Sequence, residues 1–146
     1  MSPCWEPNTD IRRGRHVVYH LPVHLVFVTK YRREVFNDAM LTRCEEIMRN
    51  VCTDFGADLI EFNGEEDHVH LLVHYPPKVA RPALVNSLKD VSSRYLRQEF
   101  TGRVNRFITH GRFWSGSYFA GSCGGAPPAI VKQYIEQKKR LLQPAG

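Results

Sequence analysis

The first segment with a clear pattern of apolar and polar positions runs from Val17 to Thr29, where apolar side chains dominate. Alternate positions of a β-strand share one face. On one face these are Val23, Leu25, Phe27 and Thr29. The other face is apolar as well, since Val26 and Val28 lie on it. A strand that is apolar on both faces is typical of the centre of a sheet, so we expect a central strand here.

The next segment has apolar residues at the three- and four-residue spacing of an amphipathic helix. They are Met40, Leu41, Cys44, Ile47, Met48, Val51, Cys52 and Phe55. Asn37 precedes this run and is a favourable N-cap, whereas Gly56 follows it and suits a helix C-terminus. The pattern therefore predicts a helix between Asn37 and Gly56.

Two short strand-like segments follow, from Ala57 to Phe62 and from His68 to Tyr75. The dipeptide Asn63-Gly64 stands between them and is a strong signal for a tight turn. We expect an antiparallel hairpin that turns at Asn63-Gly64.

The remainder of the chain predicts a second helix, a strand and a last helix. Pro82 suits the first turn of the second helix. The apolar stripe of that helix is Leu84, Val85, Leu88, Val91, Tyr95 and Leu96. Residues 107–119 are strand-like, with a break at Ser115-Gly116. The glycines and prolines of 121–127 predict a hinge, and the pattern beyond it predicts a helix at about 128–142 that carries Tyr134.

The predicted order is strand, helix, strand, strand, helix, strand, helix. This is the split βαβ, ferredoxin-like pattern of an α+β fold with an antiparallel sheet, plus an appended C-terminal helix. A chain of 146 residues has room for one domain. We assign residues 16–146 to that domain and residues 1–15 to an N-terminal extension.

Charge is divided unevenly along the chain. The net charge of +5 combines a strongly acidic stretch, residues 34–67, with a strongly basic one, residues 68–146. Nucleic acid is the commonest acidic partner of such a basic surface, and a merely solubilising surface is the alternative. No apolar run approaches the roughly 20 residues that cross a bilayer, and the N-terminal residues do not resemble a signal peptide, so we expect a cytoplasmic protein without membrane contact.

The four cysteines (Cys4, Cys44, Cys52 and Cys123) include no Cys-x-x-Cys pair, so disulfides and a zinc site are both weakly supported. Cys44 and Cys52 fall on the apolar stripe of the first helix, where a free cysteine acts as a small apolar residue.

His68 and His70 are the first candidates for chemistry. They stand two apart in a predicted strand, so both imidazoles project from one face and together can chelate a divalent metal. The alternative is two polar residues on an open strand face. Tyr134 is the second candidate, because a tyrosine hydroxyl can attack a phosphodiester when a metal polarises the phosphate. A core tyrosine is its alternative.

The residues from His16 to about Arg140 resemble the single-tyrosine transposases of the His-hydrophobic-His superfamily, the IS200-like family. The motifs that carry the resemblance are Phe27–Arg33, Asp67–Leu72, Ser87–Arg94, Phe113-Trp114, Ser117–Phe119, Gly124–Pro127 and Val131–Glu136.

The resemblance implies a homodimer that cuts and rejoins single-stranded DNA beside hairpins at the ends of a mobile element. It implies that His68 and His70 bind Mg²⁺ or Mn²⁺ and that Tyr134 becomes joined to a 5′ phosphate. It further implies that the tyrosine of one subunit can serve the histidines of the other, in trans.

One position departs from the family pattern. The family commonly has Gln four residues after the tyrosine as a third metal ligand, and this chain has Lys138 there, with Gln137 one position earlier. A protonated Lys cannot ligate a metal. The departure favours a rival interpretation, a domesticated or catalytically impaired relative that binds hairpin DNA without cutting it. A third interpretation, a ferredoxin-like RNA-binding module, needs exposed aromatic residues on central strands. Tyr19 and Phe27 are the candidates, but we expect both to belong to the core.

Overall fold

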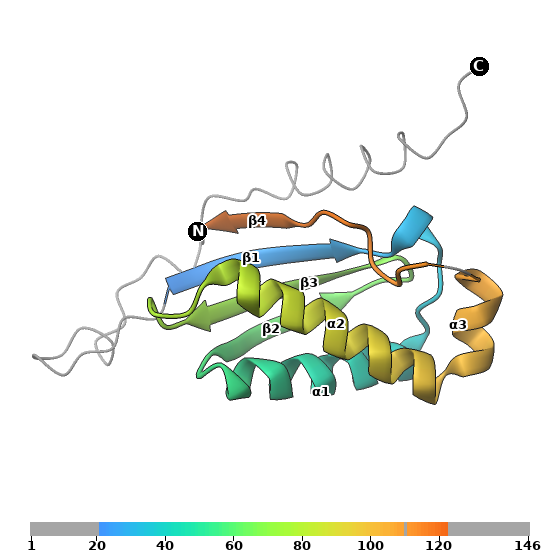
Figure 1. Cartoon of the computed structure of the whole chain (residues 1–146), viewed down its shortest axis with the longest axis horizontal. Coiled ribbons are helices and arrows are strands. Elements are labelled where there is room, and N and C mark those ends of the chain that lie inside the picture. Colours follow the sequence, from blue (N-terminus) through green and yellow to red (C-terminus); the bar gives the residue numbers. More distant parts are fainter. Residues whose placement is uncertain (1–20, 110, 123–146) are drawn as a thin grey trace, which may run out of the picture.

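The computed structural model describes residues 21–109 and 111–122. Within them the chain forms, in order, strand β1 (Leu21–Val28), the 3₁₀ turn η2 (Lys30–Arg32), helix α1 (Asp38–Asp54), strands β2 (Asp58–Gly64) and β3 (His68–Tyr75), helices α2 (Arg81–Glu99) and α3 (Thr101–Phe107), and strand β4 (Phe119–Ser122). Figure 1 shows this arrangement. The predicted N-terminal extension and the predicted C-terminal helix lie outside the described residues.

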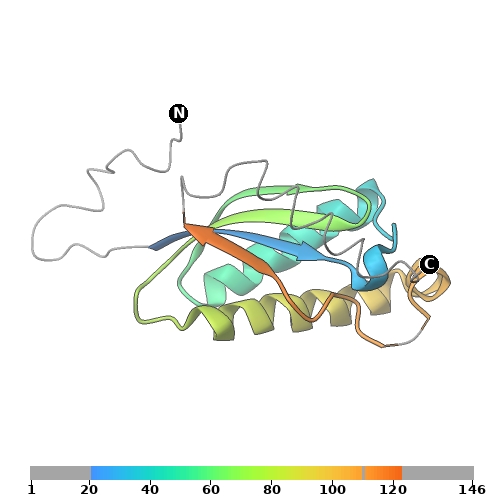
Figure 2. The same ribbon diagram turned by 90° about the horizontal axis from the view of Figure 1, so that it is seen from above.

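The strands form one antiparallel sheet in the order β2-β3-β1-β4. Helices α1 and α2 pack side by side against one of its faces (Figures 1 and 2). This order and this layering are those of the ferredoxin-like split βαβ fold, so the predicted α+β class is confirmed. The prediction that the first strand is central is confirmed too, because β3 and β4 flank β1. Val26 and Val28, on the face away from the helices, are also buried.

Helix α1 begins and ends where its sequence predicts. The side chain of Asn37 accepts a hydrogen bond of 2.8 Å from the backbone N–H of Met40, which satisfies one of the free donors of the first turn. Gly56, just after the helix, has a φ of 72°, which a glycine adopts without strain. Cys44 and Cys52 are buried free thiols in the core, as expected.

The hairpin forms, but its turn is not at Asn63-Gly64. Both residues belong to β2 and pair with His70 and Val69, so the predicted turn position is wrong. The turn is residues 65–67, closed by a 2.8 Å hydrogen bond from the Glu65 N–H to the His68 carbonyl. A Cβ on Gly64 would lie 2.5 Å from the Cδ2 of Leu41 and 3.1 Å from the Cγ1 of Val69, so these side chains would have to shift to admit it.

Strand β2 contains a bulge between Leu59 and Glu61. Leu59 pairs with Val73 and Glu61 pairs with Leu72, so Ile60 is an extra residue and its side chain is 47% exposed. Without the bulge, Leu59 and Glu61 would share one face of the strand. With it, Leu59 is buried in the core and Glu61 lies on the other face of the sheet.

The strand predicted for residues 107–119 is wrong. Helix α3 ends at Phe107, and among the described residues between it and β4, which begins at Phe119, the only strand pairing is the bridge between Thr29 and Trp114. The apolar character of this segment reflects side-chain packing instead of strand pairing. Phe113 and Trp114 are buried against Phe36, with ring centroids 5.7 and 5.6 Å from it.

The start of the predicted hinge falls within a strand. Gly121 belongs to β4 and pairs with His24 of β1. Residues 123–127, the rest of the predicted hinge, lie outside the described part of the chain.

One aromatic side chain, Phe27, lies in the core as expected, and another, Tyr95, differs from expectation. Phe27 is fully buried in the core, so it offers no stacking surface to an RNA base, and Tyr19 lies outside the described residues. Tyr95, placed on the apolar stripe of α2, is 38% exposed. The buried side of α2 instead follows the four-residue spacing of Leu84, Leu88, Ser92 and Leu96, and Tyr95 is one position off that line.

No helix among the described residues is both long enough and apolar enough to span a bilayer.

Candidate functional site

His68 and His70 lie side by side on β3. Their ring centroids are 5.0 Å apart, and the two rings are inclined at 65°. Val69, Leu71 and Val73, which alternate with the histidine face, are fully buried in the core and fix the strand. The two imidazoles therefore project from the sheet face opposite α1 and α2, as the two-residue spacing predicts.

A hydrogen-bonded chain orients His68. The Oδ1 of Asp67 lies 2.7 Å from the Nδ1 of His68, and the Nε of Arg32 donates to the Oδ2 of Asp67 over 2.6 Å. Burial raises the pKa of Asp67, but the hydrogen bonds from His68 and Arg32 outweigh burial and hold that pKa below its ordinary value. An ionised carboxylate only accepts hydrogen bonds, so Nδ1 of His68 is the donor, and in the neutral tautomer with this proton Nε2 carries the free lone pair.

The pair Arg32 and Asp67 was missed because the two residues are 35 positions apart in sequence and meet only once β1 and β3 are paired. One further feature marks Arg32. Its buried Nη1 has no hydrogen-bond partner among the described residues. A buried guanidinium nitrogen without a partner is costly, so this donor is suited to an anionic group that binds beside it.

His24 is a third imidazole that the sequence reasoning did not single out. It stands on β1, and its ring centroid lies 5.6 Å from that of His70. Burial lowers the pKa of His24, and the nearby Glu61 carboxylate partly offsets this effect. The antiparallel register of β1 and β3 makes this contact. It pairs His70 with Val26, and His24 lies two residues from Val26 on the same face of the sheet.

The surroundings of His70 favour its neutral form. Burial lowers the pKa of His70 to about 4, and the charges of His68 and His24 add to the effect. A neutral imidazole is the form that ligates metals. The donor set therefore fits a divalent cation held by His70 and by Nε2 of His68, with Asp67 as the carboxylate that orients the second ligand.

Two ligands do not complete a metal site. Among the described residues no group of three or more His, Cys, Asp and Glu side chains is arranged to hold a metal ion. Tyr134, Gln137 and Lys138 lie outside the described residues, so the structure does not place the predicted nucleophile or either candidate for the third ligand.

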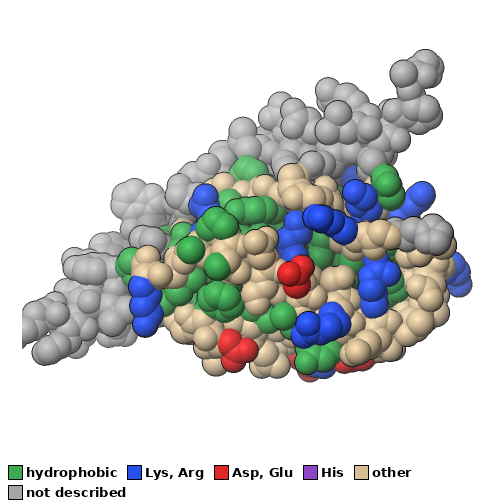
Figure 3. All heavy atoms as spheres, in the orientation of Figure 1, with side chains coloured by type: hydrophobic (Ala, Val, Ile, Leu, Met, Phe, Trp, Pro, Cys, Tyr) green, Lys and Arg blue, Asp and Glu red, His purple; other side chains and the backbone are tan. Residues whose placement is uncertain are grey.

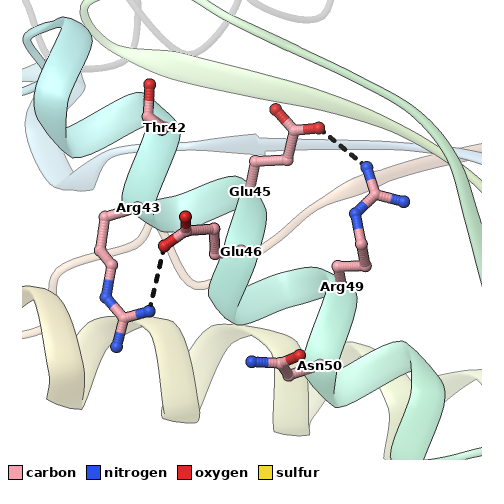
Figure 4. Close-up of a pocket in the computed structure, with 6 residues that line it drawn as sticks. All are labelled: Thr42, Arg43, Glu45, Glu46, Arg49 and Asn50. Atoms are coloured by element: carbon pink, nitrogen blue, oxygen red, sulfur yellow. Dashed lines mark hydrogen bonds and ion pairs between the residues drawn. The ribbon is translucent and has the colours of Figure 1, made fainter.

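The hollow on the outer surface of α1 is not a catalytic site (Figure 4). It has a volume of about 480 Å³ and is lined by Thr42, Arg43, Glu45, Glu46, Arg49 and Asn50, all from one helix. The charged groups pair among themselves, Arg43 with Glu46 at 3.3 Å and Arg49 with Glu45 at 2.8 Å. Arg43 also joins Glu99 of α2. These charged groups form ion pairs within α1 and between α1 and α2.

A basic surface covers α2, α3 and the segment that follows them. Lys and Arg side chains outnumber Asp and Glu on the face shown in Figure 3. Within residues 81–122 the cationic residues are Arg81, Lys89, Arg94, Arg97, Arg103, Arg106 and Arg112, against the acids Asp90 and Glu99. Part of this surface is a second hollow, of about 440 Å³, whose lining includes Lys89 and Arg112. The basic surface fits a polyanion, because phosphate contacts release condensed counterions.

Fold and site together define a ferredoxin-like α+β domain with two histidines on the sheet face opposite its helices. The family model described as "Transposase IS200 like" matches residues 17–138. The chain therefore belongs to the IS200-like transposase family.

Comparison with individual proteins gives the same family. The chain is 29% identical over 129 residues to the ISDra2 transposase TnpA of Deinococcus radiodurans, an alignment that covers 88% of this chain and 91% of that protein. It is 28% identical over 133 residues to the transposase for insertion sequence element IS200 of Salmonella typhimurium, covering 89% of this chain and 87% of that protein.

Solved structures agree as well. The chain matches the crystal structure of a transposase-family protein from Deinococcus radiodurans R1 with a TM-score of 0.77 and 31% identity, over 87% of this chain and 97% of that one. A REP-associated tyrosine transposase bound to a REP hairpin matches with a TM-score of 0.50 and 9% identity, over 86% of this chain and 67% of that one, and this second likeness concerns the fold alone.

Proposed function

We propose that this transposase cuts and rejoins single-stranded DNA at the ends of a mobile element through a 5′-phosphotyrosine formed on Tyr134. The observation that carries the proposal is the juxtaposition of His68 and His70 on the sheet face opposite the helices, with Asp67 bonded to Nδ1 of His68. Membership of the family supports the strand-transfer chemistry.

His68 and His70 would hold a divalent metal, Mg²⁺ or Mn²⁺. When bound, this ion polarises the phosphate and stabilises the charge that develops there. His70 would contribute a neutral nitrogen, and the hydrogen bond between Nδ1 and Asp67 leaves Nε2 as the nitrogen of His68 that would ligate. The unpartnered Nη1 of Arg32 is a donor for a phosphate oxygen close to His68.

The tyrosine oxygen attacks phosphorus, the P–O3′ bond breaks, and the leaving strand takes up a proton as a free 3′ hydroxyl. Rejoining is the reverse reaction, and one phosphodiester is exchanged for another, so no ATP is required.

The proposed partner is single-stranded DNA folded into hairpins. The basic surface supports a nucleic-acid partner, and the REP-associated transposase of the same fold is described as bound to a REP hairpin. We also propose a homodimer, in which Tyr134 of one subunit serves His68 and His70 of the other.

The second candidate function is hairpin binding without cleavage. The observation that favours it is Lys138, because the family commonly has a ligating Gln at this position.

The test is the formation of a covalent adduct. The purified full-length protein is incubated with labelled single-stranded element ends and Mg²⁺ or Mn²⁺, and the products are separated under denaturing conditions. We expect an adduct that is lost in Tyr134→Phe and in His68→Ala, while Tyr134→Phe still binds the hairpin. An adduct that persists in Tyr134→Phe would show that another residue is the nucleophile. Hairpin binding without any adduct in the wild type would establish the second candidate.

A further inference from the structure

Tyr31 has an unusual backbone and an exposed ring. Its φ is 59° and that of the next residue, Arg32, is 50°, so two consecutive non-glycine residues adopt the left-handed conformation. The side chain of Tyr31 is 53% exposed, the most exposed of the large apolar and aromatic side chains described. Such strain is retained where the surrounding structure enforces it, and it marks candidate functional positions.

The backbone on both sides of Tyr31 is firmly held. The Lys30 N–H donates to the Phe113 carbonyl over 2.8 Å, and the Arg32 N–H donates to the Thr29 carbonyl over 2.9 Å. The hydroxyl of Thr29 donates to the Arg33 carbonyl over 2.7 Å, which closes the turn. The ring of Tyr31 is therefore presented to solvent by a rigid support.

Two cations flank this ring. The Nζ of Lys30 lies 5.2 Å from the ring centroid, and the Cζ of Arg33 lies 5.8 Å from it. An exposed aromatic ring between cations is the combination with which proteins bind unpaired nucleotides, because every base has a face that stacks and every nucleotide has a phosphate.

The turn also lies next to the two-histidine site. The Thr29 N–H donates to the Asp67 carbonyl over 2.9 Å, and the Arg32 side chain bonds the Asp67 carboxylate. In sequence, Tyr31 lies between Thr29 and Arg32. Both of these residues bond to Asp67, which immediately precedes His68. Figure 1 shows the turn at the end of β1, beside the turn that joins β2 and β3.

We propose that Tyr31 is a stacking platform for one unpaired base of the DNA strand whose phosphate is bound at His68 and His70. Lys30 and Arg33 bind the phosphates that flank this base. The platform fixes the strand next to the scissile bond, so Tyr31 is a positioning residue. This inference rests on the proposed function for the identity of the strand, and it adds the residue that holds the neighbouring base.

The first test is equilibrium binding of a short fluorescein-labelled oligodeoxynucleotide without metal, followed by fluorescence anisotropy. We expect Tyr31→Ala to raise the Kd roughly tenfold, since loss of one aromatic stacking partner has an effect of this order. Tyr31→Phe retains the ring and retains the affinity. The matched control is Ile60→Ala, which removes an exposed apolar side chain at the bulge of β2, outside the basic surface.

A second variant separates binding from folding. Tyr31→Gly suits a φ of 59°, so the unfolding temperature stays equal or rises while the DNA affinity falls as in Tyr31→Ala. The proposal is overturned if Tyr31→Ala binds as tightly as Ile60→Ala, or if Tyr31→Phe binds as weakly as Tyr31→Ala.

The outcomes for the platform and for the proposed function are distinguishable. If the wild type forms the tyrosine adduct and the Tyr31 variants bind DNA normally, only the stacking role of Tyr31 is contradicted. A wild type that forms no adduct, with Tyr31-dependent binding, removes the cleavage function alone. A wild type that binds no single-stranded DNA removes both.

Discussion

The Oδ1 of Asp67 lies 2.7 Å from the Nδ1 of His68, one residue along the chain. Neighbouring residues of a strand usually point to opposite faces, but Asp67 is the last residue of the turn before β3, so its carboxylate can reach back to the imidazole. The turn of the hairpin thus supplies the group that orients a candidate metal ligand.

Asp67→Asn should weaken metal binding by about 10- to 100-fold, because it removes the charged acceptor that orients the His68 ring. Mn²⁺ affinity, measured by electron paramagnetic resonance, reports this loss. Glu66→Gln is the matched control, since it removes an exposed carboxylate from the same turn. Equal Mn²⁺ affinity in Asp67→Asn and Glu66→Gln would contradict the orienting role.

Stability should fall as the pH is lowered from about 6.5 towards 4. The pKa of His70 is about 4 in the folded state, against an ordinary value of 6.5. Between these values the unfolded chain binds a proton on this residue that the folded chain does not, so acid favours unfolding. His70→Gln should flatten the dependence of the unfolding temperature on pH in this window. A slope unchanged from the wild type would show that His70 is not held neutral.

Lys138→Gln should tighten Mn²⁺ binding and speed adduct formation, because it replaces a cation by a carbonyl oxygen that can ligate. If Gln137 supplies the ligand instead, Gln137→Ala loses affinity and Lys138→Gln gains little. If neither substitution changes the Mn²⁺ affinity or the rate of adduct formation, no side chain at 137 or 138 completes the site.

Gly64→Ala should destabilise the fold by about 1–3 kcal/mol, because the added methyl overpacks the contact with Leu41 and Val69. Gly102→Ala is the control. Its Cβ meets no atom within 4 Å, and it lies in α3, where Ala is favoured over Gly by about 0.5–1 kcal/mol. Denaturant unfolding measures both, and equal stability of the two variants would refute the packing role of Gly64.

Binding to single-stranded DNA should weaken as salt is raised, with a log-log slope that shrinks by about 0.7 for each phosphate contact removed. Arg112→Gln, on the basic surface, should reduce the slope. Arg49→Gln, on α1 within the acidic stretch, should not. A salt-independent affinity would point to a partner other than nucleic acid.

The features that local pattern controls could be predicted from the sequence. The Asn37 cap, the apolar stripe of α1 and the two apolar faces of β1 are each set by residues within a few positions of one another. The two-residue spacing of His68 and His70 likewise places both rings on one face.

What could not be predicted depends on contacts between distant segments. The sequence predicts Gly64 to be a turn residue, and its closeness to Leu41 becomes visible only in the folded structure. Phe113 and Trp114 read as strand residues, but the indole N–H of Trp114 donates to the hydroxyl of Ser92 on α2, and both rings fill the core. His24 joins His70 only through the register of β1 and β3.

The bulge at Ile60 has a consequence for how this strand can change in length during evolution. Loss of Ile60 would leave Leu59 in the core and Glu61 on the opposite face, because the extra residue lies outside the alternation. Loss of Phe62 would instead move the Glu61 carboxylate to a position that faces the helices, where an unpaired charge is costly. Insertions and deletions that the fold tolerates in β2 are therefore confined to the bulge, well away from the turn that carries Asp67.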